Sequence, residues 1–214
     1  MWTLPDILTP IVLCARFSHL HPGPTHWKAL LPIAGYLKKT ATVGIVYASN
    51  IFYSCSLSAL SDASWDSIPE SSRGVTGWLC LVNGMLVNYR CKIQSVVALS
   101  AMEAEKMACA DVCREVLSLR YGLEELSLAQ LSPTPVGQDS TSAIQVSLNP
   151  EYYDRTKHMR RYYNFVNDAI TEGYVELIQY ASKDMHADFL TKNLFQASLY
   201  LHLDAIGVIR GTFD

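Results

Sequence analysis

Four acidic residues stand where carboxylates could gather around a cation. They are spread along the chain at Asp62, Glu105, Asp139 and Asp188. Hydrolysis of a phosphodiester requires an activated water and a neutralised leaving oxygen, and two divalent ions about 3.5–4 Å apart can supply both. Carboxylate oxygens are ligands that Mg²⁺ prefers. These residues therefore suit a two-ion hydrolytic centre, provided that the fold brings them together.

Glu105 carries the clearest signal, because the helical pattern assigns it to a buried face. It precedes Val112 by seven residues, which returns to nearly the same side of a helix, and Val112 belongs to an apolar stripe. Glu103 is turned by about 200° from Glu105 and is expected to face solvent. A carboxylate on a core-facing side must be paired, protonated or bound to a cation. Glu105 is therefore the leading candidate for a cation ligand.

The other three carboxylates also have ordinary explanations. Asp62 could be a turn residue, Asp139 a helix N-cap, and Asp188 part of a solvated helix face. His186 is a weaker candidate for proton transfer, because on a helix its position two residues before Asp188 turns it away from that aspartate. The sequence leaves the roles of His158 and His186 open.

The densest basic cluster stands at the start of a predicted helix. Arg155, Lys157 and His158 precede Arg160 and Arg161. A helix N-terminus favours phosphate, and basic side chains beside it strengthen that preference; a solvated charge run is the alternative. Because the whole chain has a net charge of −3, a polyanion would have to be held by a local patch such as this one.

The elements that must position these residues form a mixed α/β pattern. Residues 53–59 alternate as a half-buried strand does, and Asp62 is expected just past its end. Asn83-Gly84 predicts a hairpin between 76–82 and 85–91. Further predicted elements are helices at 98–126, 140–148 and 157–172, strands at 134–137 and 174–180, and a last helix that Asp184 caps and that carries Asp188. This order indicates a mixed five-stranded sheet flanked by helices.

The composition places these elements in a globular chain with three parts. Half of the 214 residues are apolar, enough for a sizeable core. We expect a helical extension at 1–47, a main domain at 48–195 and a C-terminal tail at 196–214. Six scattered cysteines without a CxxC pair favour reduced thiols over a zinc site or disulfides. We expect neither a membrane span nor a secretion signal, because long apolar runs and a basic leader are lacking.

Six segments in the main domain resemble the ribonuclease H domain that closes the polyprotein of copia-type LTR retrotransposons. Their order and spacing match across about residues 50–195. The segments are Ser61-Asp-Ala-Ser-Trp65, Arg73-Gly-Val-Thr-Gly77, Val97-Ala-Leu-Ser-Ala-Met-Glu-Ala-Glu105, Gln138-Asp-Ser-Thr-Ser-Ala-Ile144, Arg155-Thr-Lys-His158 and Ala187-Asp-Phe-Leu-Thr-Lys192.

The front of the chain is similar to the tail of the reverse transcriptase that precedes this domain in the family. The matching segments are Leu4-Pro-Asp-Ile7, Arg16-Phe17, His26-Trp-Lys-Ala-Leu30 and Tyr36-Leu-Lys-Lys-Thr40. The paired catalytic aspartates of the polymerase are absent from the sequence. The extension is therefore expected to be a remnant of the polymerase tail or a platform for the substrate.

The resemblance implies a ribonuclease H-like fold with an N-terminal helical extension, and it implies a metal site. Two Mg²⁺ ions, with Mn²⁺ as a substitute, would be held by the family's catalytic carboxylates, which match Asp62, Glu105, Asp139 and Asp188. Two neighbours depart from the family pattern, because Ser64 replaces a frequent aspartate and Ser140 a frequent asparagine. Neither change removes a ligand.

The resemblance also implies the reaction and the partners. The expected function is cleavage of the RNA strand of RNA–DNA hybrids by two metal ions, with Arg155, Lys157 and His158 contacting the substrate. A reverse transcriptase polymerase domain is the further expected partner, no small-molecule cofactor is expected, and the setting would be a cytoplasmic virus-like particle or the nucleus. A non-catalytic module that binds nucleic acid or an element-derived particle is the alternative. An integrase or another nuclease of the same fold is a third possibility.

Overall fold

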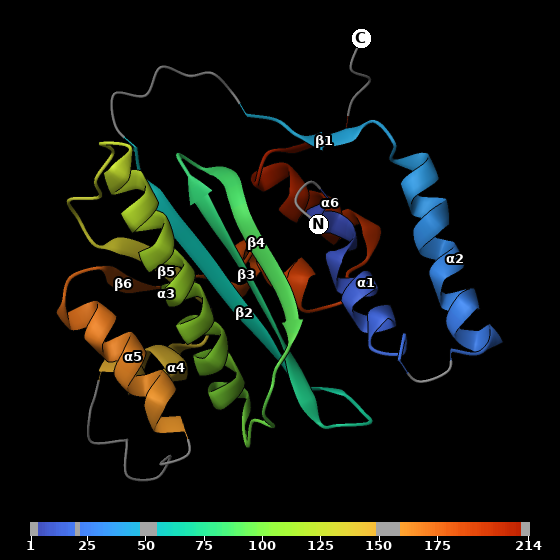
Figure 1. Cartoon of the computed structure of the whole chain (residues 1–214), viewed down its shortest axis with the longest axis horizontal. Helices are drawn as coiled ribbons and strands as arrows, with labels where there is room; N and C mark the ends of the chain where they lie inside the picture. Colours follow the sequence, from blue (N-terminus) through green and yellow to red (C-terminus); the bar gives the residue numbers. More distant parts are fainter. Residues whose placement is uncertain (1–3, 20–21, 48–54, 149–158, 211–214) are drawn as a thin grey trace.

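A five-stranded sheet forms the centre of the molecule (Figure 1). The computed structural model describes residues 4–19, 22–47, 55–148 and 159–210. The sheet contains β2 (Leu57–Ile68), β3 (Arg73–Val82), β4 (Met85–Ile93), β5 (Thr134–Gln138) and β6 (Val175–Gln179). Their order is β4-β3-β2-β5-β6, with antiparallel pairing from β4 to β2 and parallel pairing from β2 to β6. The predicted mixed sheet is therefore confirmed, and β2 lies at its middle.

Helices cover both faces of this sheet (Figure 1). On one face lie α3 (Ala101–Glu125), α4 (Thr141–Leu148) and α5 (Arg160–Thr171). On the other face lie α1 (Leu8–Ala15), α6 (Gln196–Ala205) and the short 3₁₀ turn η5 (Asp188–Leu190). Buried apolar side chains fill both interfaces, among them Trp78 and Val112 on the first and Leu79 and Leu203 on the second. The central strands are consequently buried on both faces.

The hairpin between β3 and β4 forms where Asn83-Gly84 predicts it. Val82 pairs with Met85, which leaves a two-residue turn. Asn83 and Gly84 have φ angles of 50° and 77°, the left-handed values that asparagine and glycine tolerate best. This local prediction is confirmed.

The first strand of the sheet differs from its prediction. β2 runs from Leu57 to Ile68, so Asp62 lies inside the strand and not beyond its end. Residues 48–54 lie outside the described part of the chain. The expected alternation holds from Ser56 to Ala59 and is lost from Leu60 onward, where β2 is covered on both faces and Ser61 and Asp62 are both buried. The periodicity of a half-buried strand does not apply to a strand in the middle of a covered sheet.

The predicted last helix around Asp188 is wrong. Two 3₁₀ turns, η4 (Ser182–Asp184) and η5, occupy this segment. The buried side chains of Met185, Ala187 and Phe189 recur every second residue, whereas a helix needs a spacing of three or four. The segment therefore follows an irregular path that buries each of them against the sheet.

The end of the N-terminal extension and the last described strand meet in a second, small sheet. Strand β1 (Val43–Ile45) pairs antiparallel with β7 (Val208–Arg210), so the end of the extension predicted to be helical is a strand. The hydroxyl of Thr9, which lies on α1, donates to the carbonyl oxygen of Phe189 at 2.7 Å. The remaining elements of the extension are the 3₁₀ turn η1 (Pro5–Ile7) and α2 (Pro24–Lys39), which has no buried residue. Among the described helices, none has the length and apolar character needed to cross a bilayer.

Candidate metal centre

The parallel register of β2 and β5 places two of the predicted aspartates side by side. Leu60 of β2 pairs with Gly137 of β5. Two residues further along the chain stand Asp62, within β2, and Asp139, just past the end of β5. Because the strands run in the same direction, these positions lie abreast. The sheet itself therefore brings together two carboxylates that are far apart in the sequence.

Helix α3 adds the third carboxylate from above the sheet. Glu105 is 7% exposed, and its Oε1 accepts a hydrogen bond from the backbone N–H of Ala63 at 3.2 Å. The side-chain amide of Gln138, at the end of β5, donates to the backbone carbonyl of Glu105 at 3.2 Å. One turn of α3 is thus tied both to the strand of Asp62 and to the strand that leads to Asp139.

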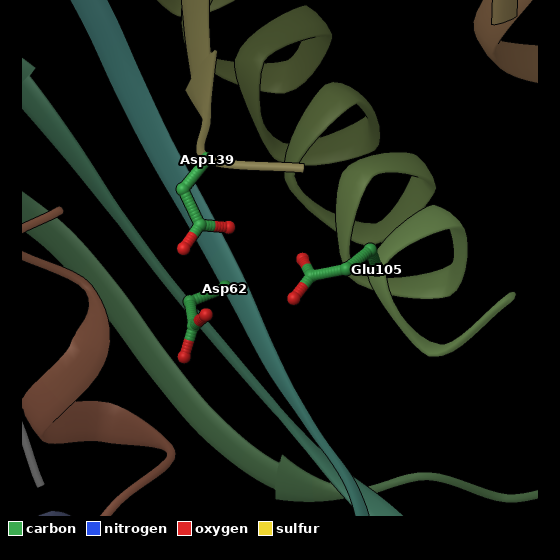
Figure 2. A group of neighbouring side chains, drawn as sticks. All are labelled: Asp62, Glu105 and Asp139. Atoms are coloured by element: carbon green, nitrogen blue, oxygen red, sulfur yellow. The ribbon is translucent and has the colours of Figure 1, made fainter. Parts of the chain in front are cut away.

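Oxygen atoms of Asp62, Glu105 and Asp139 all lie within 4.8 Å of one another (Figure 2). The figure shows the two aspartates directed from the sheet and the glutamate directed toward them from α3. Asp139 is free for this arrangement because the hydroxyl of Ser140, and not Asp139, accepts from the Ala143 N–H at the start of α4. We refer to these three residues as the carboxylate cluster.

Asp188 lies beside the carboxylate cluster but not in it. Its Oδ1 is 2.9 Å from the ammonium nitrogen of Lys192. The same nitrogen lies 3.4 Å from Oδ1 of Asp62. The structure therefore brings together three of the four predicted ligands and connects the fourth to Asp62 through a lysine.

A close contact between β3 and η5 positions the segment that carries Asp188. Gly77 is the antiparallel partner of Asp62. A Cβ at Gly77 would stand 2.7 Å from the Cβ of Leu190 and 2.6 Å from the Cγ2 of Thr191, so only glycine permits this approach. The approach brings the hydroxyl of Thr191 to Asp62, whose Oδ2 accepts a hydrogen bond from it.

Burial makes the cluster costly to ionise without a cation. Burial raises the pKa of Glu105 to about 9, and the neighbouring carboxylates of Asp62 and Asp139 add to the rise. Burial also raises the pKa of Asp62 to about 6, although the ammonium of Lys192 opposes this. Like charges held together in a low-dielectric place favour protonation. A bound cation would remove that penalty.

The donors present fit a hard divalent ion. Oε2 of Glu105 is buried and has no hydrogen-bond partner, which is costly for a carboxylate oxygen unless a ligand takes it. The cluster supplies oxygen atoms alone, and carboxylate oxygens suit Mg²⁺ and Mn²⁺ better than softer metals. Asp62, Glu105 and Asp139 could therefore hold such an ion.

The prediction that Glu103 faces solvent is wrong. Glu103 is 4% exposed, and its Oε2 accepts a hydrogen bond from the N–H of Leu99 at 2.8 Å. The hydroxyl of Ser100 accepts in turn from the Glu103 N–H at 3.3 Å. These two hydrogen bonds resemble a capping box at the start of α3, with Glu103 reaching Leu99, the residue before the N-cap Ser100. Glu103 is thus buried by its role in starting the helix, while Glu105 turns toward the sheet.

The basic residues and histidines predicted from the sequence are not found in the carboxylate cluster among the described residues. Arg155, Lys157 and His158 lie outside the described residues. The ring of His186 faces the ring of His202, with their Nδ1 atoms 3.1 Å apart. Burial lowers the pKa of His186, and the neighbouring His202 lowers it further. His186 is therefore paired with another histidine in this structure.

Sequence reasoning missed three side chains that touch the candidate ligands. The hydroxyl of Ser182 donates to Oδ2 of Asp139 at 3.2 Å, while Thr191 and Lys192 contact Asp62. Lys192 stands four residues after Asp188, a spacing that permits an ion pair across one turn. That spacing could have identified Lys192, whereas Ser182 has no comparable signal in the sequence.

The metal-free protein is expected to lose stability as the pH rises. The folded state holds a proton on Glu105 up to a pKa of about 9, against an ordinary value of 4.5. The stabilising contribution is therefore complete below the ordinary value and is lost as the pH rises through the folded value. Between about pH 5 and 9 the wild-type free energy of unfolding should fall, relative to Glu105→Gln, by up to about 1.4 kcal/mol per pH unit.

Urea unfolding in the presence of a chelator, followed by circular dichroism at several pH values, measures this difference. Glu103→Gln serves as the matched control, because a glutamine can still complete the capping box. It should keep the wild-type dependence on pH. Parallel profiles for wild type and Glu105→Gln would contradict the assignment of a raised pKa to Glu105.

Comparison with known sequences identifies several relatives, among them the following two. The chain is 29% identical over 206 residues, 96% of its length, to the retrovirus-related Pol polyprotein from transposon TNT 1-94 of Nicotiana tabacum. It spans 15% of the length of that polyprotein. It is 36% identical over 117 residues to the secreted RxLR effector protein 161 of Plasmopara viticola, covering 55% of this chain and 80% of that protein. No protein-family model matches the chain.

Solved structures resemble the chain at low sequence identity. RNase H1 from Halobacterium salinarum NRC-1 is 14% identical with a TM-score of 0.47, over 63% of this chain and 93% of that one. LC11-RNase H1, solved in complex with an RNA/DNA hybrid, is 11% identical with a TM-score of 0.43, over 63% and 93%. The prototype foamy virus protease-reverse transcriptase is 14% identical with a TM-score of 0.42, over 88% and 28%.

The alignment with the Pol polyprotein and the topology of the sheet agree with each other. Nearly the whole chain aligns with a retrotransposon Pol polyprotein. The chain also has the mixed five-stranded sheet flanked by helices that the sequence predicts. The chain is thus a relative of a retrotransposon Pol polyprotein over nearly its whole length, and it has a ribonuclease H-like fold.

Proposed function

We propose that this chain is a metal-dependent ribonuclease H that hydrolyses the RNA strand of RNA–DNA hybrids. The observation that carries the proposal is the convergence of Asp62, Glu105 and Asp139 from three separate elements of the fold. One of the oxygens in this cluster is buried without a partner. A protein does not gain stability from such a group, so a role in binding a cation is the better account.

The proposed site is one for Mg²⁺, with Mn²⁺ as a substitute, held by the carboxylate cluster. When bound, such an ion supplies Lewis acidity at a phosphoryl oxygen and lowers the pKa of a coordinated water. The residues of the chain hold the ligand oxygens in place: the Ala63 N–H orients Glu105, and the hydroxyl of Thr191 orients Asp62. Asp62, a member of the cluster, is connected to Asp188 through Lys192, so Asp62 and Asp188 are the residues that would hold a second ion.

The proposed substrate is recognised by shape and charge. An RNA–DNA hybrid exposes the 2′-hydroxyls of one strand in a wide minor groove, so a protein can identify the RNA strand without reading its sequence. We assign the phosphate contacts to Arg155, Lys157 and His158. Arg160 and Arg161, which follow them on α5, are exposed and extend the same positive segment.

The proposed partner within a longer Pol protein is the polymerase domain. Helix α2 leaves apolar side chains in solvent, with Trp27 65% and Leu31 53% exposed. Both residues lie in the extension that carries the segments similar to the reverse transcriptase tail, so a polymerase domain is the surface that would cover them. Such a protein would act in a cytoplasmic virus-like particle or in the nucleus.

A non-catalytic module that binds nucleic acid is the second candidate. The observation in its favour is the ion pair between Lys192 and Asp188. In this pair the lysine ammonium, and not a metal ion, contacts the fourth predicted ligand. Cleavage assays separate the two candidates, since both predict binding and only the first predicts hydrolysis.

Hybrid cleavage tests the proposed function. Wild type should cut the RNA strand of a labelled RNA–DNA hybrid in Mg²⁺ or Mn²⁺, should leave duplex DNA and duplex RNA intact, and should stop in a chelator. Asp62→Asn, Glu105→Gln and Asp139→Asn should each lower the rate by about 10²–10³-fold or more, the scale for losing one electrostatic stabiliser of a transition state.

Glu103→Gln is the matched control for this assay. It changes a buried glutamate on the same helix, two residues away, while keeping the capping hydrogen bond. It should cut at close to the wild-type rate. A folded wild-type protein that binds hybrid but does not cut it in either metal would leave the non-catalytic module as the function.

The basic segment generates a separate prediction about binding. Replacing both Arg155 and Lys157 by alanine should weaken hybrid binding and reduce the slope of log K against log[salt] by about 2, one unit for each lost phosphate contact. Fluorescence anisotropy with a labelled hybrid at several salt concentrations measures this slope. An unchanged slope would remove these residues from the interface.

A further inference from the structure

Lys192 occupies a place between two of the predicted metal ligands. Its Nζ lies 2.9 Å from Oδ1 of Asp188 and 3.4 Å from Oδ1 of Asp62. The Asp62 side chain is 1% exposed, whereas the Lys192 side chain is 41% exposed. Among the ion pairs that the described residues form, Lys192 is the partner of both aspartates. The Lys192 ammonium therefore places a positive charge beside the cluster, next to Asp62.

The backbone holds Lys192 in this position. The N–H of Lys192 donates to the carbonyl oxygen of Asp188 at 2.9 Å, which closes a turn on which the two side chains form an ion pair. The close contact with Gly77 fixes the preceding residue, Thr191, against β3. The stem of Lys192 starts from this rigid turn, while its partly exposed end is free to move into solvent.

We propose that Lys192 is a tethered cation that holds the second cation position, between Asp62 and Asp188, when a divalent ion is bound by Asp62, Glu105 and Asp139. This inference rests on the proposed function, because it takes the carboxylate cluster as a metal site. Two bound ions are expected from the sequence. Under this proposal one ion is bound tightly, and a second ion must compete with Lys192 for its position.

The charge balance supports this division. The four carboxylates carry four negative charges when ionised, and one divalent ion together with the Lys192 ammonium leaves a net charge of minus one. A second divalent ion would give the site a positive excess and would stand beside the ammonium. Repulsion at such short range in a partly buried site is strong. A second ion therefore binds well only when Lys192 turns away or is removed.

Titration with Mn²⁺ tests the proposal without relying on catalysis. Free Mn²⁺ is followed by electron paramagnetic resonance, and the heat of binding by calorimetry, for the full chain as wild type, Lys192→Met and Lys192→Arg. Wild type should bind one ion tightly and a second weakly. Lys192→Met should bind the second ion about tenfold more tightly or better, while Lys192→Arg, which keeps the charge, should behave as wild type.

Asp188→Asn provides the complementary variant. In the Lys192→Met background it should abolish the tightened second ion and leave the first unchanged, because Asp188 contributes to the second position alone. Circular dichroism confirms that each variant is folded, which is expected because the Lys192 side chain is partly exposed.

Two contrary results have different meanings. Suppose that wild type binds one ion tightly and that Lys192→Met binds the second ion with equal or lower affinity. Lys192 then only positions Asp188, and the inference about a tethered cation is overturned. If wild type has no tight ion and Glu105→Gln changes nothing, the metal centre itself is overturned and the inference falls with it.

Discussion

The burial of the Asp62 carboxylate in the central strand is the constraint on which the rest of the site depends. An aspartate that is 1% exposed must be stabilised by its surroundings. Thr191 and Lys192 supply such contacts, whereas the neighbouring carboxylates oppose its ionisation unless a cation is bound. Strand β5 places Asp139 abreast of it, α3 brings Glu105 over it, and the segment of η5 presents Thr191 and Lys192 from the opposite face. The central sheet thus surrounds the Asp62 carboxylate, which water does not reach.

The described parts of the N-terminal extension and the C-terminal tail support the site without contacting the carboxylate cluster. The segment after β6 must follow a path along the sheet that an α-helix would not permit. Helix α1 supports it from outside through the hydrogen bond between Thr9 and Phe189, and α6 packs against the same core with Leu203. The pairing of β1 with β7 joins the extension to the C-terminal strand. The parts predicted to be a remnant and a tail therefore support the turn that carries Asp188.

Local signals in the sequence predicted much of this architecture, whereas long-range contacts did not follow from it. The Asn83-Gly84 turn and the helix of Glu105 each depend on neighbouring residues, and both were predicted. The extent of β2 around Asp62 was not, because alternation indicates burial on one face and this strand is buried on both. Glu103 was misplaced since helical periodicity ignores capping. Lys192 was missed because its significance arises only when β2 and η5 are adjacent.

The central claim is that Asp62, Glu105 and Asp139 form a site for a divalent ion. Diffraction from crystals soaked in Mn²⁺, with data collected for the anomalous signal of manganese, tests it most directly. The account predicts a peak at coordinating distance, about 2.0–2.3 Å, from oxygens of all three carboxylates, including the Oε2 of Glu105 that is unpartnered in the present structure. Crystals in which manganese binds elsewhere, while these three side chains keep their positions without an ion, would contradict it.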